Sequence, residues 1–487
     1  MAALARTADG GASSPAVHPI DEVLPAPKLA AYGFQHVLAF YAGAVLVPIL
    51  VANALGLSSE QLIHLINADL FTCGIASIIQ SVGFWKIGVK LPLLQGVTFT
   101  AVSPMIAIGL AVGGGTQGLL AIYGAVIVAG LLTFFAAPYF AKLLRYFPPV
   151  VTGSVITVIG LSLLPVAMRW AGGGAGAADF GSISNVALAA ITLAIILVIY
   201  RFLPGFFSRI AIIVGLVAGG VVAALMGKLD FSKVGQADAF AISTPFHFGA
   251  PTFQVAAIVS MIIVMLVIMT ETTADLLAIG VIVGRPADRK TVANGLRADC
   301  ISTAASGGLL NAFPVSAFAQ NVGLVALTGI RSRFVVATSG VILLVLGLFP
   351  QVGAVVAALP LPVLGGAGLA LFGTVAASGI RSLAAVRYDG NSNLVIVALA
   401  IAAGLVPIAV PDLYHGFPEW FQTIFDSGIS AAAVTAVTLN IFFNVLGRKD
   451  DAAPIFAESP AIGVTPDEHP GGHVPNEPAS TERRTTD

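Results

Sequence analysis

The chain has 487 residues, of which 57% are hydrophobic and only 10% are charged, and its formal net charge is −1. A soluble domain carries about 25% charged residues, so this composition excludes a soluble globular protein and indicates a polytopic membrane protein. No nucleic-acid partner is expected, because no basic patch interleaved with aromatic residues is present. The two cysteines, Cys73 and Cys300, lie in apolar segments without metal-ligand neighbours and are expected to be packing residues.

Two tails and fourteen apolar spans divide the chain. Residues 1–27 are rich in Ala, Gly and Pro, and residues 448–487 are rich in Pro, Glu, Asp and Thr, so both are predicted to be disordered tails. The segments between them have the length of membrane-crossing helices and predict an all-α polytopic protein. The spans are expected at about 30–53, 66–86, 92–112, 118–140, 149–169, 183–203, 208–227, 252–283, 293–311, 316–330, 333–350, 361–380, 393–411 and 425–446.

The positive charges predict the orientation of these spans. With fourteen spans and the N-terminus inside, twenty of the 23 lysines and arginines fall on the inside. Only Arg169, Lys228 and Lys233 fall on the outside, which is a strong positive-inside bias. Both termini are therefore predicted to be cytoplasmic. The polar loop 228–250, which separates the first seven spans from the last seven, is predicted to be extracytoplasmic.

An internal repeat relates the two sets of seven spans. PVVTGSVITVIG, starting at Pro149, is similar to PVLGGAGLALFG, starting at Pro362, and four identical residues share an offset of 213. These segments are the fifth and the twelfth spans, so the offset is seven spans. Because seven is odd, the two halves must have opposite topology in the membrane. Inverted repeats of this kind are typical of secondary transporters, which bind substrate at the repeat interface near the midplane.

The tenth span and its repeat partner, the third, are predicted to be broken at the midplane. A helix from Gln320 to Ile330 would be about 16 Å long, roughly half of a hydrocarbon core, so Gln320 would lie at depth. Backbone that is not helical at that depth must be buried in protein or line a cavity. Two short strands could satisfy each other there, and the helix N-termini would offer free N–H groups to a ligand. The corresponding polar residues of the third span are Gln95, Thr98, Phe99 and Thr100.

Two carboxylates lie within the eighth span. Glu271 and Asp275 are four residues apart and are therefore predicted to share one helix face. Two unpaired carboxylates would repel each other at depth, so at least one is expected to hold a proton, as a proton-coupled carrier requires. The alternative is a pair of acids at a helix end that faces the cytosol, but the span ends ten or more residues later, near Arg285.

Other polar residues in the spans have competing interpretations. Asp299 either belongs to a functional network or forms a local ion pair with Arg297. His36 is as well explained by a buried, hydrogen-bonded histidine as by a substrate contact. Asp69 and Asp426 are expected to be solvated or helix-capping residues near the outer ends of their spans.

Catalytic motifs are absent from the sequence. No nucleophile elbow, phosphate loop, HExxH pair or CxxC motif is present. The chain is therefore not expected to be an enzyme, and the intramembrane acids favour transport.

The segment QNVGLVALTG, residues 320–329, resembles the signature of the nucleobase–ascorbate transporter family (nucleobase:cation symporter-2), which reads Gln/Glu-Asn-x-Gly-x4-Thr-Gly/Arg/Lys. The resemblance extends over nearly the whole membrane part, and only the two tails fall outside it. Further blocks in the family's order are QHVLAFYAGAVLVP at 35–48, QGVTF at 95–99, ETTAD at 271–275, RAD at 297–299 and LPLPVLGGAGLALFGT at 359–374.

The resemblance implies fourteen spans in two inverted repeats, proton-coupled uptake without a metal or organic cofactor, and a homodimer in the lipid of a bacterial inner membrane. It also implies two domains, each built from both halves of the chain. The core domain would comprise residues 28–140 and 251–350, and the gate domain would comprise residues 141–227 and 351–447.

Site residues follow from the family's motifs. The resemblance implies that Glu271 accepts the ring N–H groups of a base and that the Gln320 amide both donates to the base and accepts from it. Phe99 would contribute its backbone N–H and its ring, and Thr98 would tune selectivity. Residues with coupling or supporting roles would be Asp275, Asp299, His36, Asn321 and Thr100.

The substrate branch is indicated by the same signature. Gln followed by Asn, with Gly after the Thr, resembles the xanthine and uric acid branch, whereas uracil carriers usually have Glu in place of the Gln. An amide suits an oxidised purine, which carries adjacent donors and acceptors, and an ionised carboxylate only accepts. Uric acid, with xanthine as a second substrate, is therefore expected. Uracil or another nucleobase is the first alternative.

An anion exchanger or channel of the same architecture is the second alternative. Such a protein needs a positive binding site, often one basic residue near the break. No Lys or Arg lies between Pro92 and Thr100 or between Phe313 and Gly329, which argues against it.

Overall fold

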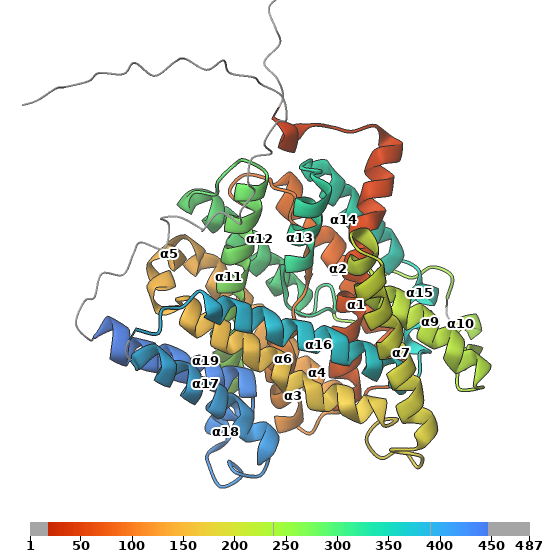
Figure 1. The fold of residues 1–487 in the computed structure, drawn as a ribbon. Coiled ribbons are helices and arrows are strands. Elements are labelled where there is room, and N and C mark those ends of the chain that lie inside the picture. Colours follow the sequence, from red (N-terminus) through yellow and green to blue (C-terminus); the bar gives the residue numbers. More distant parts are fainter. Residues whose placement is uncertain (1–17, 237, 390, 447–487) are drawn as a thin grey trace, which may run out of the picture. The chain divides into compact units, whose positions relative to one another are not determined.

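Apolar helices make up most of the secondary structure in the computed structural model, which describes residues 18–236, 238–389 and 391–446 (Figure 1). Within these ranges nine helices are long and apolar enough to cross a membrane, counting the short extensions that follow α4 and α19. They are α1 (Ala26–Leu55), α2 (Ser59–Val82), α4 (Gly115–Ala136), α6 (Pro149–Ala171), α7 (Ile183–Phe202), α11 (Val255–Ile282), α16 (Leu361–Ala384), α17 (Ser392–Ala409) and α19 (Gly428–Asn440).

A bent pair of helices forms a tenth apolar unit. The eleventh span was predicted as one segment, 333–350, but α14 (Arg333–Gly347) is followed by α15 (Pro350–Ala357) at an angle of 80°. Pro350 is the first residue of α15, where its missing N–H costs nothing. Inside a continuous helix the pyrrolidine ring of Pro350 would clash with the preceding turn, so this proline explains the break between α14 and α15.

Shorter or more polar helices occupy the remaining predicted spans. These are α3 (Val102–Ala111), α9 (Ala211–Leu225), α12 (Arg289–Ser306) and α13 (Ala319–Thr328). Every predicted span therefore contains a helix, although these four lack the length or the apolar composition of a complete crossing. The remaining described elements are η1 (Pro19–Asp21), η2 (Phe99–Ala101), η3 (Ala137–Tyr139), α5 (Phe140–Leu143), η4 (Leu144–Tyr146), α8 (Phe206–Arg209), α10 (Ser232–Gln236), α18 (Glu419–Phe425) and η5 (Ile441–Val445).

The start of α2 was predicted about seven residues too late. Ser58 and Gln61 form a capping box, in which Ser58 Oγ accepts from Gln61 N at 3.2 Å and Gln61 Oε1 accepts from Ser58 N at 2.9 Å. Asp69 consequently lies well inside the helix. It is 1% exposed and accepts a hydrogen bond from Phe313 N at 2.9 Å, so the prediction of a solvated or capping residue was wrong.

Part of the predicted N-terminal tail is packed. Ile20 in η1 is fully buried, and Asp21 accepts from Arg333 Nε at 2.7 Å. The expectation of a disordered tail over residues 1–27 is therefore wrong for its last ten residues. Residues 1–17 and the predicted C-terminal tail, 448–487, lie outside the described residues.

Two short strands interrupt the helices, as predicted. β1 (Gln95–Val97) and β2 (Val315–Ala317) pair antiparallel with Gly96 opposite Ser316. The pairing continues beyond both strands, because Thr98 N donates to Pro314 O at 3.0 Å and Phe318 N donates to Leu94 O at 3.1 Å. All six strand residues are buried. One residue after β1 the chain enters η2 and then α3, and one residue after β2 it enters α13.

The two segments of the predicted repeat pack against each other. α6 and α16 run side by side (Figure 1), and small residues let their backbones touch. A Cβ on Gly160 would come within 2.3 Å of Ala376 N, and a Cβ on Gly379 would come within 2.3 Å of Thr157 N. Gly160 faces Ala376 while the earlier Thr157 faces the later Gly379, so the two helices are antiparallel, as β1 and β2 are.

Candidate functional site

A cavity of about 850 Å³ lies where the broken spans meet α11. The segment after β1 contributes Thr98, Phe99 and Thr100, and the first turn of α13 contributes Gln320. α11 contributes Glu271 and Asp275, one turn apart on the same face. Six of the predicted site residues, from three segments distant in sequence, therefore line one cavity.

The carboxylate of Glu271 is held by Thr100. The Thr100 hydroxyl lies 3.0 Å from Glu271 Oε1 and 2.8 Å from Oε2, so it can donate to either oxygen. Thr100 is fixed in turn, because its N–H donates to Thr98 Oγ1 at 3.2 Å in the turn that opens η2. Both threonines are buried. The third and eighth spans are thus joined through the acid itself, whose remaining lone pairs face the cavity.

The Gln320 amide is available for a ligand. Its side chain is half-buried, lines the cavity and has no hydrogen-bond partner in the described part of the chain. An amide provides two donor hydrogens and one acceptor oxygen. Gln320 is the second residue of α13, and at this helix start Phe318 N and Asn321 N are already bonded, to Leu94 O and Phe318 O. The N–H groups of Ala319 and Gln320, without partners among the described residues, add donors beside the amide.

Phe99 forms an apolar wall of the cavity. Its ring contacts Phe372 of α16 edge-to-face at 5.7 Å between centroids, and only 9% of the residue is exposed. Phe318, on the opposite broken span, also lines the cavity, and its ring packs on Phe40 at 4.7 Å. A flat ligand between Glu271 and Gln320 would therefore meet fixed aromatic surfaces.

Asp299 lies behind the cavity rather than in its lining. Asp299 Oδ2 accepts from the Thr272 hydroxyl at 2.6 Å, and Oδ1 accepts from Gln80 Nε2 at 2.9 Å. The Thr272 hydroxyl also accepts from Ala317 N of β2 at 3.3 Å. The alternative of an ion pair with Arg297 is not observed, since Arg297 instead donates to Asn294 Oδ1 at 3.1 Å. Asp299 thus ties α11 and α2 to the strand next to the site.

Gln80 is a member of this network that the sequence analysis missed. It is fully buried, donates also to Gly295 O at 3.1 Å and accepts from Val89 N at 3.0 Å. An isolated glutamine in an apolar helix was the available signal, because a buried amide requires partners.

Asn321 of α13 and His36 of α1 contact each other outside the cavity lining. Asn321 Nδ2 is 2.8 Å from His36 Nδ1, and Asn321 Oδ1 accepts from Leu94 N at 2.8 Å, just before β1. Both side chains are buried and neither lines the cavity. Of the two interpretations left open for His36, the structure therefore favours the buried, hydrogen-bonded histidine.

Arg209 is a cavity residue that the sequence analysis missed. It ends α8, yet its guanidinium lies against α13, where a Cβ on Gly323 would come within 2.7 Å of Nη1. Arg381, in the last turn of α16, also lines the cavity. The two chain stretches around the break contain no Lys or Arg, which argued against an anion exchanger, but other segments bring arginines to the cavity. A distant helix end supplies the cation.

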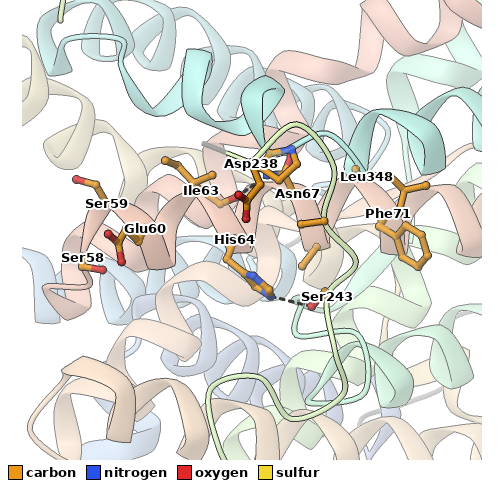
Figure 2. A pocket seen from close by; sticks show the side chains of 14 residues that line it. Ser58, Ser59, Glu60, Ile63, His64, Asn67, Phe71, Asp238, Ser243 and Leu348 are labelled. Atoms are coloured by element: carbon orange, nitrogen blue, oxygen red, sulfur yellow. Dashed lines mark hydrogen bonds between the residues drawn. The ribbon is translucent and has the colours of Figure 1, made fainter. Parts of the chain in front are cut away.

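A second cavity, of about 700 Å³, lies beside the first turns of α2 (Figure 2). His64 points toward Ser243 of the loop 228–250, with 2.7 Å between Nε2 and Oγ. The acids on its wall are Glu60 and Asp238. No predicted site residue lines this cavity, and its histidine is already hydrogen-bonded, so the first cavity is the better candidate.

Comparison with known proteins places the sequence among permeases. The family described as "Permease family" matches residues 27–413. The chain is 44% identical to the xanthine permease of Bacillus subtilis over 421 residues, which cover 86% of this chain and 95% of that protein. It is 43% identical to the uric acid permease PucJ of the same organism over 428 residues, with coverage of 87% and 94%. The uric acid transporter UacT of Escherichia coli is 42% identical over 427 residues, with coverage of 87% and 88%.

Solved structures with the same fold are more distant in sequence. Murine Slc26a9, an anion transporter in its inward-facing state, has a TM-score of 0.60 at 11% identity, covering 87% of this chain and 69% of that one. The transmembrane domain of the cyanobacterial bicarbonate transporter BicA has a TM-score of 0.55 at 15% identity, covering 85% and 98%. At this identity the likeness shows the fold alone, that of an all-α polytopic membrane protein.

Proposed function

The chain belongs to the xanthine/uracil permease family, the nucleobase:cation symporter-2 group, and on this premise we propose that it is a proton-coupled importer of uric acid that also accepts xanthine. It is a multi-pass membrane transporter and not an enzyme. The observation that supports the substrate class is the pair of polar groups in one cavity: the Glu271 carboxylate, held by Thr100, and the Gln320 amide, which has no partner among the described residues.

Recognition of a purine would use the complementary chemistry of these two side chains. Glu271 accepts from ring N–H groups, and Gln320 donates to a carbonyl while accepting from a neighbouring N–H. The Phe99 ring packs on the flat face of the base, and the N-terminal N–H groups of α13 add donors. Thr98, which lines the same wall, tunes selectivity. Permeases for uric acid and for xanthine are both among the similar proteins.

Proton coupling is proposed from the two acids of α11. Glu271 and Asp275 are half-buried on one helix face in the cavity. Two ionised carboxylates so close would repel each other, so a proton on one of them lowers the energy of the loaded site. Asp299, His36 and Asn321 support the site from behind through the hydrogen bonds described above.

The proposed architecture is fourteen spans in two inverted repeats. The antiparallel pairings of β1 with β2 and of α6 with α16 support it, because each pair relates corresponding segments of the two halves. A core domain, 28–140 and 251–350, would move against a gate domain, 141–227 and 351–447, to expose the site alternately. We further propose a homodimer in the plasma membrane, with both termini cytoplasmic and the loop 228–250 outside.

Uptake by living cells tests the substrate. A bacterium lacking its own purine permeases should accumulate radiolabelled urate and xanthine when it expresses the chain, and excess unlabelled urate should compete. Absence of uptake of both purines above background, with the protein present in the membrane, would rule out the proposal. Stronger competition by uracil than by urate would support the alternative of a uracil or other nucleobase permease.

A further inference from the structure

Two arginines at the rim of the cavity have no role in the recognition proposed above. Arg209 ends α8 and Arg381 lies in the last turn of α16, and both side chains are exposed while lining the cavity. Neither takes part in any of the ion pairs found among the described residues. Within the part of the chain that the structure describes, these two cations have no acidic partner and can serve a ligand.

Arg209 is the closer of the two to the polar end of the cavity. Its guanidinium packs against Gly323, three residues after Gln320 on α13. Three residues correspond to about 4.5 Å along a helix axis, so Arg209 contacts α13 within one turn of the position of Gln320. Gly323 has no side chain, so the guanidinium lies close to the helix backbone; a Cβ there would come within 2.7 Å of Nη1.

The charges of the cavity explain why a cation is needed. Its inner wall carries two carboxylates, Glu271 and Asp275. Urate is a monoanion near neutral pH, whereas xanthine is mostly neutral, so these acids oppose the entry of urate far more than the entry of xanthine. A guanidinium can offset this repulsion, and its planar, weakly hydrated group can donate two parallel hydrogen bonds to an oxyanion.

We propose that Arg209 is a specificity-determining residue of the cavity, which favours anionic oxidised purines over neutral ones. This inference rests on the proposed function, because it assumes that the cavity takes a purine. The competing explanation is that Arg209 only orients the chain in the membrane. That role would explain a basic residue at a helix end, but it would not require the contact between Arg209 and α13. Arg201, at the end of α7, provides the comparison: it is also exposed, packs on Phe202 and does not line the cavity.

Equilibrium binding to the purified full-length protein tests the inference. Radiolabelled urate and radiolabelled xanthine are titrated slightly below neutral pH and at low salt, against wild type, R209Q, R209K and the control R201Q. We expect R209Q to weaken urate binding at least tenfold, equivalent to about 1.4 kcal/mol, while xanthine binding changes less than about threefold. R209K should retain much of the preference, and R201Q should match wild type.

A measurement on the wild type makes the test independent of how the variants fold. Salt screens the exposed charge of Arg209 more than the half-buried charges of Glu271 and Asp275. Raising the ionic strength should therefore weaken urate binding and leave xanthine binding nearly unchanged. Equal losses for both purines in R209Q, or salt dependence that is the same for both, would overturn the inference and leave the proposed function standing. A wild type that binds neither purine would instead refute the proposed function.

Discussion

The hydroxyl of Thr100 donates to the carboxylate of Glu271, at 2.8 Å from one oxygen and 3.0 Å from the other. This contact joins the segment after β1 to the middle of α11, 171 residues apart in the chain. It leaves the carboxylate in the cavity with lone pairs for a ligand. The position of the Glu271 carboxylate therefore depends on a hydrogen bond between two spans. Substitution of either residue alone tests this dependence.

Thr100→Val removes this hydroxyl with little change in shape. A hydrogen bond to a charged group contributes about 1.5–3 kcal/mol, so the apparent affinity for urate should fall about 10- to 100-fold. Thr100→Ser keeps the donor and should remain within a few-fold of wild type. Kinetics of radiolabelled urate uptake, normalised to membrane-inserted protein, provide the measurement. Wild-type kinetics in the valine variant would show that the bond does not position Glu271.

Gln320→Glu replaces an amide that donates and accepts by a carboxylate that only accepts when ionised. A site that loses a required donor discriminates against its substrate by about 1–3 kcal/mol, so the apparent affinities for urate and xanthine should each fall by about 5- to 150-fold. Uracil should compete more strongly in this variant than in wild type. The measurement is a set of competition curves for urate, xanthine and uracil in the variant and in wild type. An unchanged affinity for urate would mean that Gln320 does not contact the purine.

Asp299→Ala removes an acceptor that serves both Gln80 and Thr272. Each buried donor left without a partner costs about 1–3 kcal/mol, so the variant should unfold at a lower temperature than wild type. Asp299→Asn keeps one acceptor and should lose less stability. Thermal unfolding in detergent is the readout for both variants.

Transport by Asp299→Asn separates a positioning role from a coupling role. Because the residue lies behind the cavity, the variant should retain uptake that depends on the proton gradient. Stable protein whose uptake no longer depends on the gradient would instead assign the coupling proton to Asp299.

Gly379→Ala tests the contact between α6 and α16. The added methyl would come within 2.3 Å of Thr157 N, a backbone atom that cannot move without shifting α6. Overpacking of this kind costs about 1–3 kcal/mol, so the amount of folded protein recovered from membranes should fall. Gly373→Ala, on the same helix with no atom within 4 Å of the added methyl, is the matched control. Equal yields from the two variants would contradict the close packing of the helices.

The sequence predicted the centre of the fold well because two independent constraints met there. Polar residues around Gln320 could not lie in a continuous membrane helix, and the repeat pointed to a second such stretch near Thr98. Backbone N–H and C=O groups inside the membrane must be hydrogen-bonded, so two broken spans predicted a pair of short strands. The structure contains these strands as β1 and β2. The helical spacing of Glu271 and Asp275 likewise predicted a shared face that lines the cavity.

The prediction for Asp69 was wrong, and Arg209 was missed, because tertiary contacts determine the surroundings of both side chains. The polarity of Asp69 favoured an exposed helix end, but its carboxylate is buried by the packing around α2, and Oδ1 accepts from Phe313 N. Arg209 lies 114 residues before Gly323 in the numbering and reaches it only through the packing of α8 on α13. No local pattern encodes such an approach, since a basic residue at a helix end equally satisfies the positive-inside rule.

Transport by purified protein reconstituted in proteoliposomes tests the central claim most directly. With an imposed pH gradient, acidic on the side from which urate is supplied, the vesicles should accumulate radiolabelled urate above its equilibrium level, and a protonophore should abolish the accumulation. Glu271→Gln, which removes the carboxylate but not its shape, should fail to accumulate urate under the same gradient. Vesicles with inserted wild-type protein that take up neither urate nor xanthine, with or without the gradient, would contradict the account.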